Sequence, residues 1–388
     1  MKSSFTWNFS NPSDYTYNTS KITFATDING DDYITLTNPA DMTFPYIINA
    51  TGVYFTFINK ITTVETDTVS GAVIRYQLSQ NGEDWYFYNT STALWELTAV
   101  TTGTYSEIVS ASNSDVELSK AICEKFATQV DSGKLYWKAF LMSDGNNSPR
   151  LYSFKFDFEQ YYTTIKLIRD LMSPYGLRAR DPISGLYCVD TDFLSDDKIR
   201  AYIPLADSYI NSSCFRDFYY HRDVVEFHDG NNTEGMITYF FPITKISHVI
   251  MYNQLLQAMR TFLDFEIIIH PEWGELFLPP AYPAFLSDKP SRAIFGNIFI
   301  YGKRNVEIMY DYGYDVPLED IQQAASKYAG ILVLQAYWAW LTRGIQSRSF
   351  DGYSESYMQK PFEGITEIWR KEIEMIINTN RKQFQRSI

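Results

Sequence analysis

Residues 305–340 read NVEIMYDYGYDVPLEDIQQAASKYAGILVLQAYWAW, and they lead from a strand pattern into the clearest helix pattern of the chain. Asp315 can cap this helix, and Pro317 suits its first turn. Glu319 and Asp320 complement the positive end of the helix dipole. The part ILVLQAYWAW is apolar nearly all round. We therefore expect a helix that runs to about residue 343 and is buried on several sides, with neighbouring subunits as candidates for the cover.

Further helix patterns flank this stretch. One covers residues 161–174 and stops at a proline and a glycine. Another begins at Ser195 and contains Pro204, where we expect a kink or a break. A last amphipathic helix covers about residues 361–383. Residues 215–310 return to short strand patterns.

Residues 1–158 are rich in short runs of β-branched and aromatic residues, many of which alternate polar and apolar. This pattern is typical of half-buried strands. Dipeptides that tolerate positive φ separate the runs, namely Asn29-Gly30, Asn81-Gly82 and Asp144-Gly145. One helix pattern begins at Ser114 or Asp115 and extends to Val130. We therefore predict an antiparallel β-sandwich of jelly-roll or lectin-like type.

The whole chain is accordingly predicted to be an α+β protein with two domains. The first domain, residues 1–158, is the β-sandwich. The second, residues 159–388, is a helical domain with a β insertion at about 215–310. A length of 388 residues suits two domains. The aromatic content of 17% suits extended strands and protein–protein contact.

Composition argues against several classes of protein. A net charge of −13 disfavours the coating of nucleic acid, which needs clustered Lys and Arg. No continuous apolar run approaches the ~20 residues of a membrane helix, and no secretory signal is visible, so we expect no membrane partner. Cys123, Cys188 and Cys214 are too few and too dispersed for a disulfide scaffold or a four-cysteine zinc site.

Motifs that carry chemistry are mostly absent from the sequence. GxSxG, GxGxxG and GxxxxGKS do not occur, and the four histidines form neither HExxH nor HxH. His221 and His228 are seven apart in a strand pattern and would face opposite sides, which disfavours a metal site. Asp27 begins a sequence similar to a calcium loop, but its glycine is misplaced and a turn is favoured. We expect no enzyme activity, no cofactor and no metal.

The second half of the chain resembles the head–tail adaptor (connector) proteins of tailed bacteriophages. In that family a strand ends in a Tyr-Gly-Tyr or similar turn and leads through a Val-Pro pattern into a central helix. The corresponding residues here are Tyr312-Gly313-Tyr314-Asp315-Val316-Pro317, followed by Ile321, Gln323 and Ala324. Residues 195–210 are similar to an early helix, and SFDGYSESY (349–357) to a later loop. The resemblance covers roughly residues 160–388.

This resemblance implies a structural virion protein of the phage neck, made in the host cytoplasm. In the family, rings of usually twelve copies dock on the portal and join the capsid to the tail, while DNA passes through the lumen without specific binding. A tail-side neck, stopper or tail protein would be a further partner, and fibre or collar proteins could bind the N-terminal domain. Candidate portal contacts are Trp369, Arg381, Lys382 and Arg386. Candidate subunit-interface residues are Tyr337, Trp338, Trp340, Asp351 and Tyr353.

The alternative hypothesis is a tail- or baseplate-associated carbohydrate-binding (lectin-like) protein. The aromatic-rich sandwich motivates it, and Trp85 beside Glu83-Asp84 could form the edge of a sugar site. A hairpin turn with Trp85 in the sandwich core is the favoured interpretation of these residues.

Overall fold

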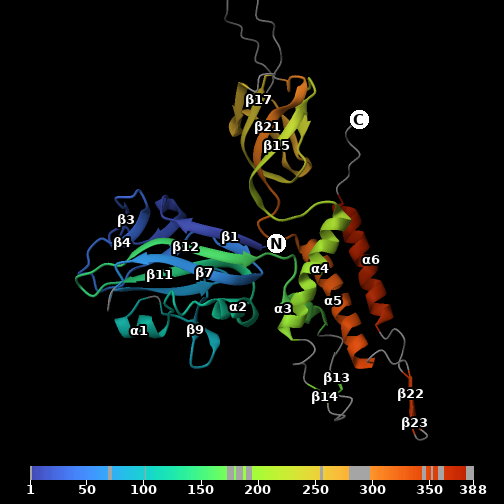
Figure 1. Ribbon diagram of the computed structural model, residues 1–388, viewed down its shortest axis with the longest axis horizontal. Helices are drawn as coiled ribbons and strands as arrows, with labels where there is room; N and C mark the ends of the chain where they lie inside the picture. The colour runs from blue at the N-terminus through green and yellow to red at the C-terminus, as the bar shows by residue number, and fades with distance from the viewer. Residues whose placement is uncertain are drawn as a thin grey trace, which may run out of the picture. The chain divides into compact units, whose positions relative to one another are not determined.

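The computed structural model describes residues 2–68, 72–100, 102–172, 179–180, 187–188, 195–253, 257–278, 298–342, 347–350, 353–356 and 362–381. The chain forms two compact units, which are described separately. The first unit comprises residues 1–210 and 322–376, and the second comprises 211–321 and 377–388. The structure confirms a mixed α and β fold with antiparallel sheets (Figure 1).

Two antiparallel sheets make up the N-terminal part of the first unit. The smaller sheet has the order β1 (Lys2–Asn8), β12 (Arg150–Glu159), β4 (Asp32–Leu36) and β3 (Ile22–Thr26), with β7 (Phe57–Thr66) also paired to β12. The larger sheet has the order β10 (Leu94–Thr98), β9 (Trp85–Asn89), β8 (Val73–Ser79), β11 (Gly133–Met142), β5 (Tyr46–Asn49) and β2 (Tyr15–Tyr17), with β6 (Val53–Phe55) paired to β11.

An aromatic core joins these two sheets. The rings of Trp137 on β11 and Phe154 on β12 stack with centroids 4.7 Å apart and planes 11° apart. Trp7 on β1 packs edge-on against both rings. Burial on both sides explains why β11 carries an almost continuous apolar run, because a half-buried strand would alternate. Apolar side chains of both sheets belong to one buried cluster.

The first unit also contains three short helices in the loops between its strands. They are η1 (Pro12–Asp14), α1 (Tyr105–Ser110) and α2 (Lys120–Gln129). The sequence pattern placed the start of α2 too early, at Ser114 or Asp115. Its actual N-cap is Ser119, and Val116, which lies within the predicted helix pattern, is 81% exposed. Residues 114–118 instead form turns, in which the Leu118 N–H donates to the Ser114 carbonyl.

Four longer helices follow: α3 (Ile165–Met172), α4 (Asp196–Cys214), α5 (Glu319–Thr342) and α6 (Glu363–Asn380). The predicted end of α3 at residue 174 lies outside the described residues. Of the kink or break expected at Pro204, the break is wrong, because α4 continues through this proline, and the kink stays a prediction. The predicted cap at Asp315 is wrong too, since α5 starts only at Glu319. Tyr314 forms a parallel β-bridge with Tyr219 ahead of the helix.

The second unit contains two further antiparallel sheets. The four-stranded sheet has the order β15 (His221–Gly230), β21 (Gly302–Tyr312), β17 (Ile243–Tyr252) and β18 (Ala258–Leu263). The three-stranded sheet has the order β16 (Gly235–Ile237), β20 (Glu275–Phe277) and β19 (Ile268–His270). The short helices η3 (Asp264–Glu266) and η4 (Pro271–Trp273) flank β19. Apolar side chains from both sheets form one buried cluster.

Two small hairpins complete the described structure. They are β13 (Ala179–Arg180) with β14 (Tyr187–Cys188), and β22 (Ser347–Phe350) with β23 (Tyr353–Ser356). Among the helices that the structure describes, none combines the length and the apolarity that a bilayer crossing requires.

Candidate interaction surfaces

The apolar helix α5 is covered by other helices of its own unit. Tyr328 stacks on Tyr209 of α4, with ring centroids 4.0 Å apart. Gly330 lies against the Trp369 ring of α6 and Leu171 of α3, where a Cβ atom would come within 3.1 Å of the Trp369 ring. Burial on several sides is therefore confirmed for residues 324–337, but the cover comes from the same chain. Hydropathy signals burial without identifying the partner, which is why sister copies were a candidate.

The predicted subunit-interface residues fall at the end of α5 and beyond it. Tyr337 is 5% exposed and Trp338 is half-buried, and each ring lies 6.5 Å from the ring of Phe362. The side chains of Trp340 and Tyr353 and the whole of Asp351 lie outside the described residues. Their role at an interface stays a prediction.

The predicted portal contacts occupy different environments. Trp369 is only 4% exposed and packs within the first unit, so it could touch a partner only after repacking. Arg381, in the second unit, is exposed. Its Nε donates to the Ser213 carbonyl at 3.1 Å, and its guanidinium lies 5.4 Å from the Phe215 ring centroid. Lys382 and Arg386 lie outside the described residues. A portal role for these residues stays a prediction.

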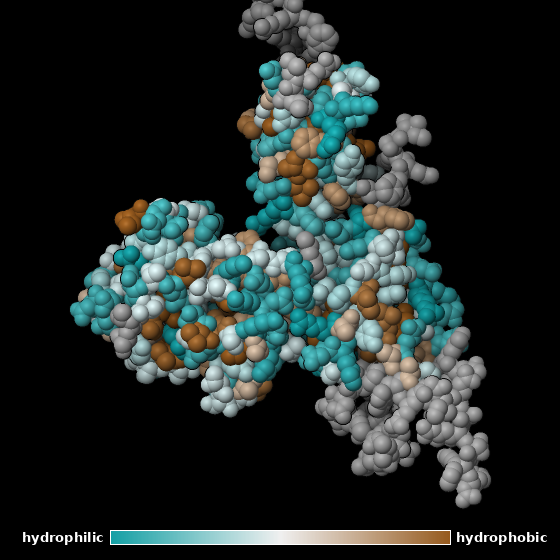
Figure 2. Space-filling view, in the orientation of Figure 1, coloured by the Kyte–Doolittle hydropathy of each residue, from teal (hydrophilic) through white to brown (hydrophobic). Residues whose placement is uncertain are grey.

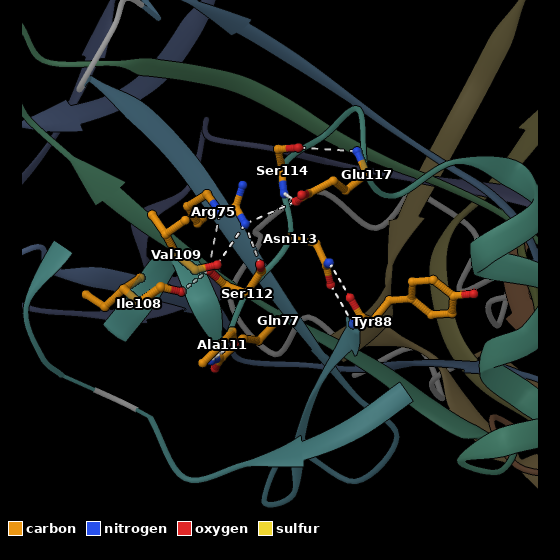
Figure 3. Close-up of polar contacts among 10 residues, drawn as sticks. All are labelled: Arg75, Gln77, Tyr88, Ile108, Val109, Ala111, Ser112, Asn113, Ser114 and Glu117. Carbon is orange, nitrogen blue, oxygen red and sulfur yellow. Dashed lines mark hydrogen bonds and ion pairs between the residues drawn. The ribbon is translucent and has the colours of Figure 1, made fainter. Parts of the chain in front are cut away.

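A buried arginine fixes the loop after α1 to the larger sheet of the first unit. Arg75 on β8 donates from Nη2 to the carbonyls of Val109, at 3.0 Å, and Ser112. The same nitrogen lies 3.0 Å from the Glu117 carboxylate (Figure 3). Burial lowers the pKa of Arg75, and the Glu117 charge opposes this shift. The guanidinium is thus used to hold backbone in place.

Asn113 from the same loop bridges two strands of that sheet. Its backbone exchanges N–H to carbonyl hydrogen bonds with Tyr76 on β8, at 2.7 and 2.9 Å. Its side chain accepts from the Tyr88 N–H at 2.7 Å and donates to the Tyr88 carbonyl at 2.9 Å (Figure 3). Strands β8 and β9 pair directly only at Leu78 and Tyr86. Asn113 therefore takes the place of strand pairing where the two strands diverge.

A buried lysine sits among aromatic rings on β11. Lys138 is 1% exposed, and its Nζ lies 4.1 Å from the Trp85 ring centroid and 5.2 Å from that of Tyr46. Burial lowers the pKa of Lys138 from 10.5 to about 8. Trp85 is 7% exposed, so its predicted burial is confirmed, and its ring cannot stack on a sugar in solution. Its predicted place in the sandwich core is wrong, because Trp85 packs on Lys138 and is not part of the buried cluster that joins the two sheets.

The Asp27 carboxylate, which the sequence compares with a calcium ligand, forms hydrogen bonds within the turn between β3 and β4. Asp27 Oδ1 accepts the backbone N–H groups of Asn29 and Asp31, at 2.8 and 3.0 Å. These hydrogen bonds lower the pKa of Asp27, with the one from Asp31 contributing most. Gly30 supplies a φ of +90°. The predicted turn is confirmed.

A buried polar network lies inside the second unit. Glu226 accepts from the Tyr239 N–H at 2.9 Å and from the Tyr310 hydroxyl, and its Oε2 lies 2.7 Å from His228 Nε2. Burial raises the pKa of Tyr310, and the hydrogen bond to Glu226 raises it further. The buried carboxylate of Glu226 therefore finds its hydrogen-bond partners within the core.

The prediction that His221 and His228 face opposite sides of their strand is wrong. A register shift between His221 and Val224 inserts one extra residue, and His221 pairs with Tyr312 while His228 pairs with Val306. Such a bulge returns both imidazoles to the inner face. They remain separate, since His221 pairs with Asp217 at 3.0 Å and stacks on Tyr312. Within the described ranges, no group of three His, Cys, Asp or Glu side chains could hold a metal ion.

No protein-family model matches this chain, and no curated protein matches it. Among solved structures, it is similar to a chain from the virion of a native gene transfer agent particle. The sequences are 15% identical, the TM-score is 0.28, and the alignment covers 58% of this chain and 90% of that chain. At this TM-score the likeness carries no argument about fold or function.

Proposed function

We propose that this protein is a structural component of a virion, a head–tail adaptor that assembles as a ring on the portal. The observation that supports the proposal is the passage from β21 into α5, whose sequence resembles the strand, turn and helix pattern of that family. Gly313 has a φ of +94°, and its N–H donates to the Pro242 carbonyl at 2.9 Å. The neighbouring Tyr314 bridges to Tyr219 before the helix starts.

The backbone around Gly313 is packed so closely that only a glycine fits at this position. A Cβ atom at residue 313 would lie 1.8 Å from the Tyr219 carbonyl oxygen, so a larger residue would force the backbone apart. Only glycine combines a positive φ with such an approach at low cost. The Tyr-Gly-Tyr turn is thus a structural joint between the sheet of the second unit and the central helix.

The proposed role needs no chemical step by this chain. The charged and polar groups described above hold backbone or one another, as Arg75 and Asn113 do. A net charge of −13 suits a lumen that lets DNA pass without gripping its phosphates. The two packed sheets of the first unit, as a β-sandwich, would serve as an outward platform for fibre or collar proteins.

Co-assembly with the portal tests the proposal. The full-length chain is mixed with the portal protein of the same virus, masses are measured by mass photometry, and the particles are imaged by negative stain. We expect a discrete complex with many copies of this chain on each portal. Arg381→Ala should weaken the complex, whereas Lys60→Ala, which removes an exposed cation of the first unit, should not. A chain that never joins the portal would refute the proposal.

A further inference from the structure

Asparagine precedes glycine at two places in the sequence, Asn29-Gly30 and Asn81-Gly82. The backbone nitrogen after an asparagine can attack the side-chain amide of that asparagine, and glycine obstructs this approach least because it has no Cβ atom. Every other asparagine of the chain precedes a residue with a side chain. Both asparagines of the two pairs are exposed, so water reaches each of them. Their hydrogen bonds, however, differ.

The side chain of Asn29 is held weakly, in a turn between β3 and β4 that projects into solvent. The neighbouring Ile28 is 102% exposed, and Figure 2 shows mostly hydrophilic surface over the part of the first unit that contains β3 and β4. Asn29 Nδ2 lies 3.4 Å from Asp27 Oδ2, and no other side-chain hydrogen bond of Asn29 exists within the described residues. The Gly30 N–H donates to the Asp27 carbonyl at 3.1 Å. A Cβ atom at Gly30 would meet nothing within 4 Å, so the amide has room to rotate.

The side chain of Asn81 is held firmly, in the turn between β8 and β9. Its Oδ1 accepts the N–H groups of Glu83 and Asp84, both at 2.9 Å, and the Ser79 hydroxyl at 3.0 Å. Its Nδ2 donates to Asp84 Oδ2 at 3.0 Å. The Gly82 N–H, which carries the nitrogen that would attack, donates to Ser79 Oγ at 2.8 Å. The amide and the nitrogen of this pair are therefore both engaged elsewhere.

We propose that Asn29 is a site of spontaneous deamidation in the folded protein, and that the fold protects Asn81 from the same reaction. The Gly30 nitrogen attacks Asn29 Cγ, so that a bond forms between these atoms and the bond from Cγ to Nδ2 breaks. Nδ2 leaves as ammonia and takes the proton that the Gly30 nitrogen gives up. The product is a five-membered succinimide. Water opens this ring at either carbonyl and yields aspartate or isoaspartate, and no atom is oxidised or reduced.

The reaction changes the charge and the backbone of this turn. Aspartate at residue 29 adds a negative charge beside Asp27, Asp31 and Asp32. Isoaspartate lengthens the backbone by one methylene group and displaces the N–H groups of residues 29 and 31, which donate to Asp27 Oδ1 at 2.8 and 3.0 Å. Since β3 is an edge strand, we expect isoaspartate to loosen the β3–β4 hairpin and to leave the aromatic core intact. The modified fraction rises with the age of the protein, whatever its role in a particle.

The hydrogen bonds set the expected difference in rate. Attack at Asn29 breaks two of them, and the one from the side chain is long and therefore weak. Attack at Asn81 breaks five, four from the side chain and one from the Gly82 N–H. A ~10-fold difference in rate corresponds to a barrier difference of ~1.4 kcal/mol, about the net contribution of one or two hydrogen bonds. We therefore expect Asn29 to react at least ~10-fold faster than Asn81 in the folded chain.

Peptide mapping of the aged full-length chain tests the proposal. The purified protein is kept in neutral buffer, and samples taken over time are digested at mildly acidic pH. Mass spectrometry then measures the deamidated fraction at Asn29 and at Asn81, and an isoaspartyl methyltransferase labels the isoaspartate. The same chain in concentrated urea should react at similar rates at the two sites, because the hydrogen bonds of the fold are lost. Equal rates in the folded chain, or a difference that persists in urea, would overturn the proposal.

Two variants test whether hydrogen bonds protect Asn81. Ser79→Ala removes the acceptor of the Gly82 N–H and one donor to Asn81 Oδ1. Asp84→Ala, at an exposed position, removes the acceptor of Asn81 Nδ2. Each variant should speed the reaction at Asn81 and leave the rate at Asn29 unchanged, and circular dichroism confirms that each is folded. If Asn81 reacts no faster in either folded variant, these hydrogen bonds do not protect it, and the proposal is wrong.

Discussion

Lys138 shows how burial can reverse the usual contribution of a charged residue. Its ammonium is buried among aromatic rings, and within the described residues no carboxylate lies within ion-pair distance. The pKa is about 8 in the folded chain and 10.5 in an ordinary setting. The unfolded chain therefore holds the proton more tightly. This residue costs stability below pH 8, and the cost disappears as the pH rises towards 10.5.

Lys138→Met should stabilise the protein at pH 7. The gain should be roughly 1–3 kcal/mol, because the desolvation cost is removed while some cation–π attraction is lost. Chemical denaturation at pH 7 and at pH 10 measures the difference from the unchanged chain, which should shrink at the higher pH. A variant less stable than the unchanged chain at pH 7 would mean that the aromatic rings more than offset the burial of the charge.

Gly313 and Gly30 have similar backbone conformations but differ in how closely other atoms approach them. Alanine substitutions at the two positions therefore measure how much steric crowding adds to the loss of stability. Their φ values are +94° and +90°. A Cβ atom at Gly30 would meet nothing within 4 Å, whereas one at Gly313 would collide with the backbone of Tyr219. Gly30→Ala should cost about 1 kcal/mol, for the backbone conformation alone. Gly313→Ala should cost clearly more, and equal losses in thermal and denaturant unfolding would refute the close-packed joint.

The Asn113 bridge is a second element whose removal has a defined cost. Asn113→Ala leaves the N–H and the carbonyl of Tyr88 without their present partner. Each buried backbone group left unpaired costs about 1–3 kcal/mol, so we expect a loss of roughly 2–5 kcal/mol. Hydrogen exchange should also speed up at Tyr88. Asn146→Ala, at an exposed asparagine of the first unit, serves as the control and should change stability by less than about 0.5 kcal/mol.

The elements differ in how far the sequence could predict them. Turns at dipeptides such as Asn29-Gly30 were predictable, because a positive φ favours those residue types. Helix α6 was predictable from its apolar stripe and lies at Glu363–Asn380. Strand β15 was expected as a strand, but the facing of its side chains was not predictable, because Val225 and Phe227 face outward while Glu226 and His228 are buried. Alternation alone favours the reverse arrangement, and only the bulge near His221 and the partners of Glu226 explain it.

The predicted interaction residues depend on information that lies outside a single chain. Trp338 was predicted as a subunit-interface residue and Trp369 as a portal contact, but hydropathy cannot tell an interface from the interior of one subunit.

At the scale of the whole molecule, we propose a chain that is built for assembly. The buried polar groups stabilise the fold, and the Tyr-Gly-Tyr joint links a sheet to the central helix.

The position of this chain in the intact particle tests the central claim most directly. A cryo-electron microscopy map of the virion that contains it can be traced at the vertex that joins the head to the tail. The account predicts a closed ring of this chain between the portal and the tail. Density for the chain only at a fibre or a baseplate, or its absence from the particle, would contradict the account.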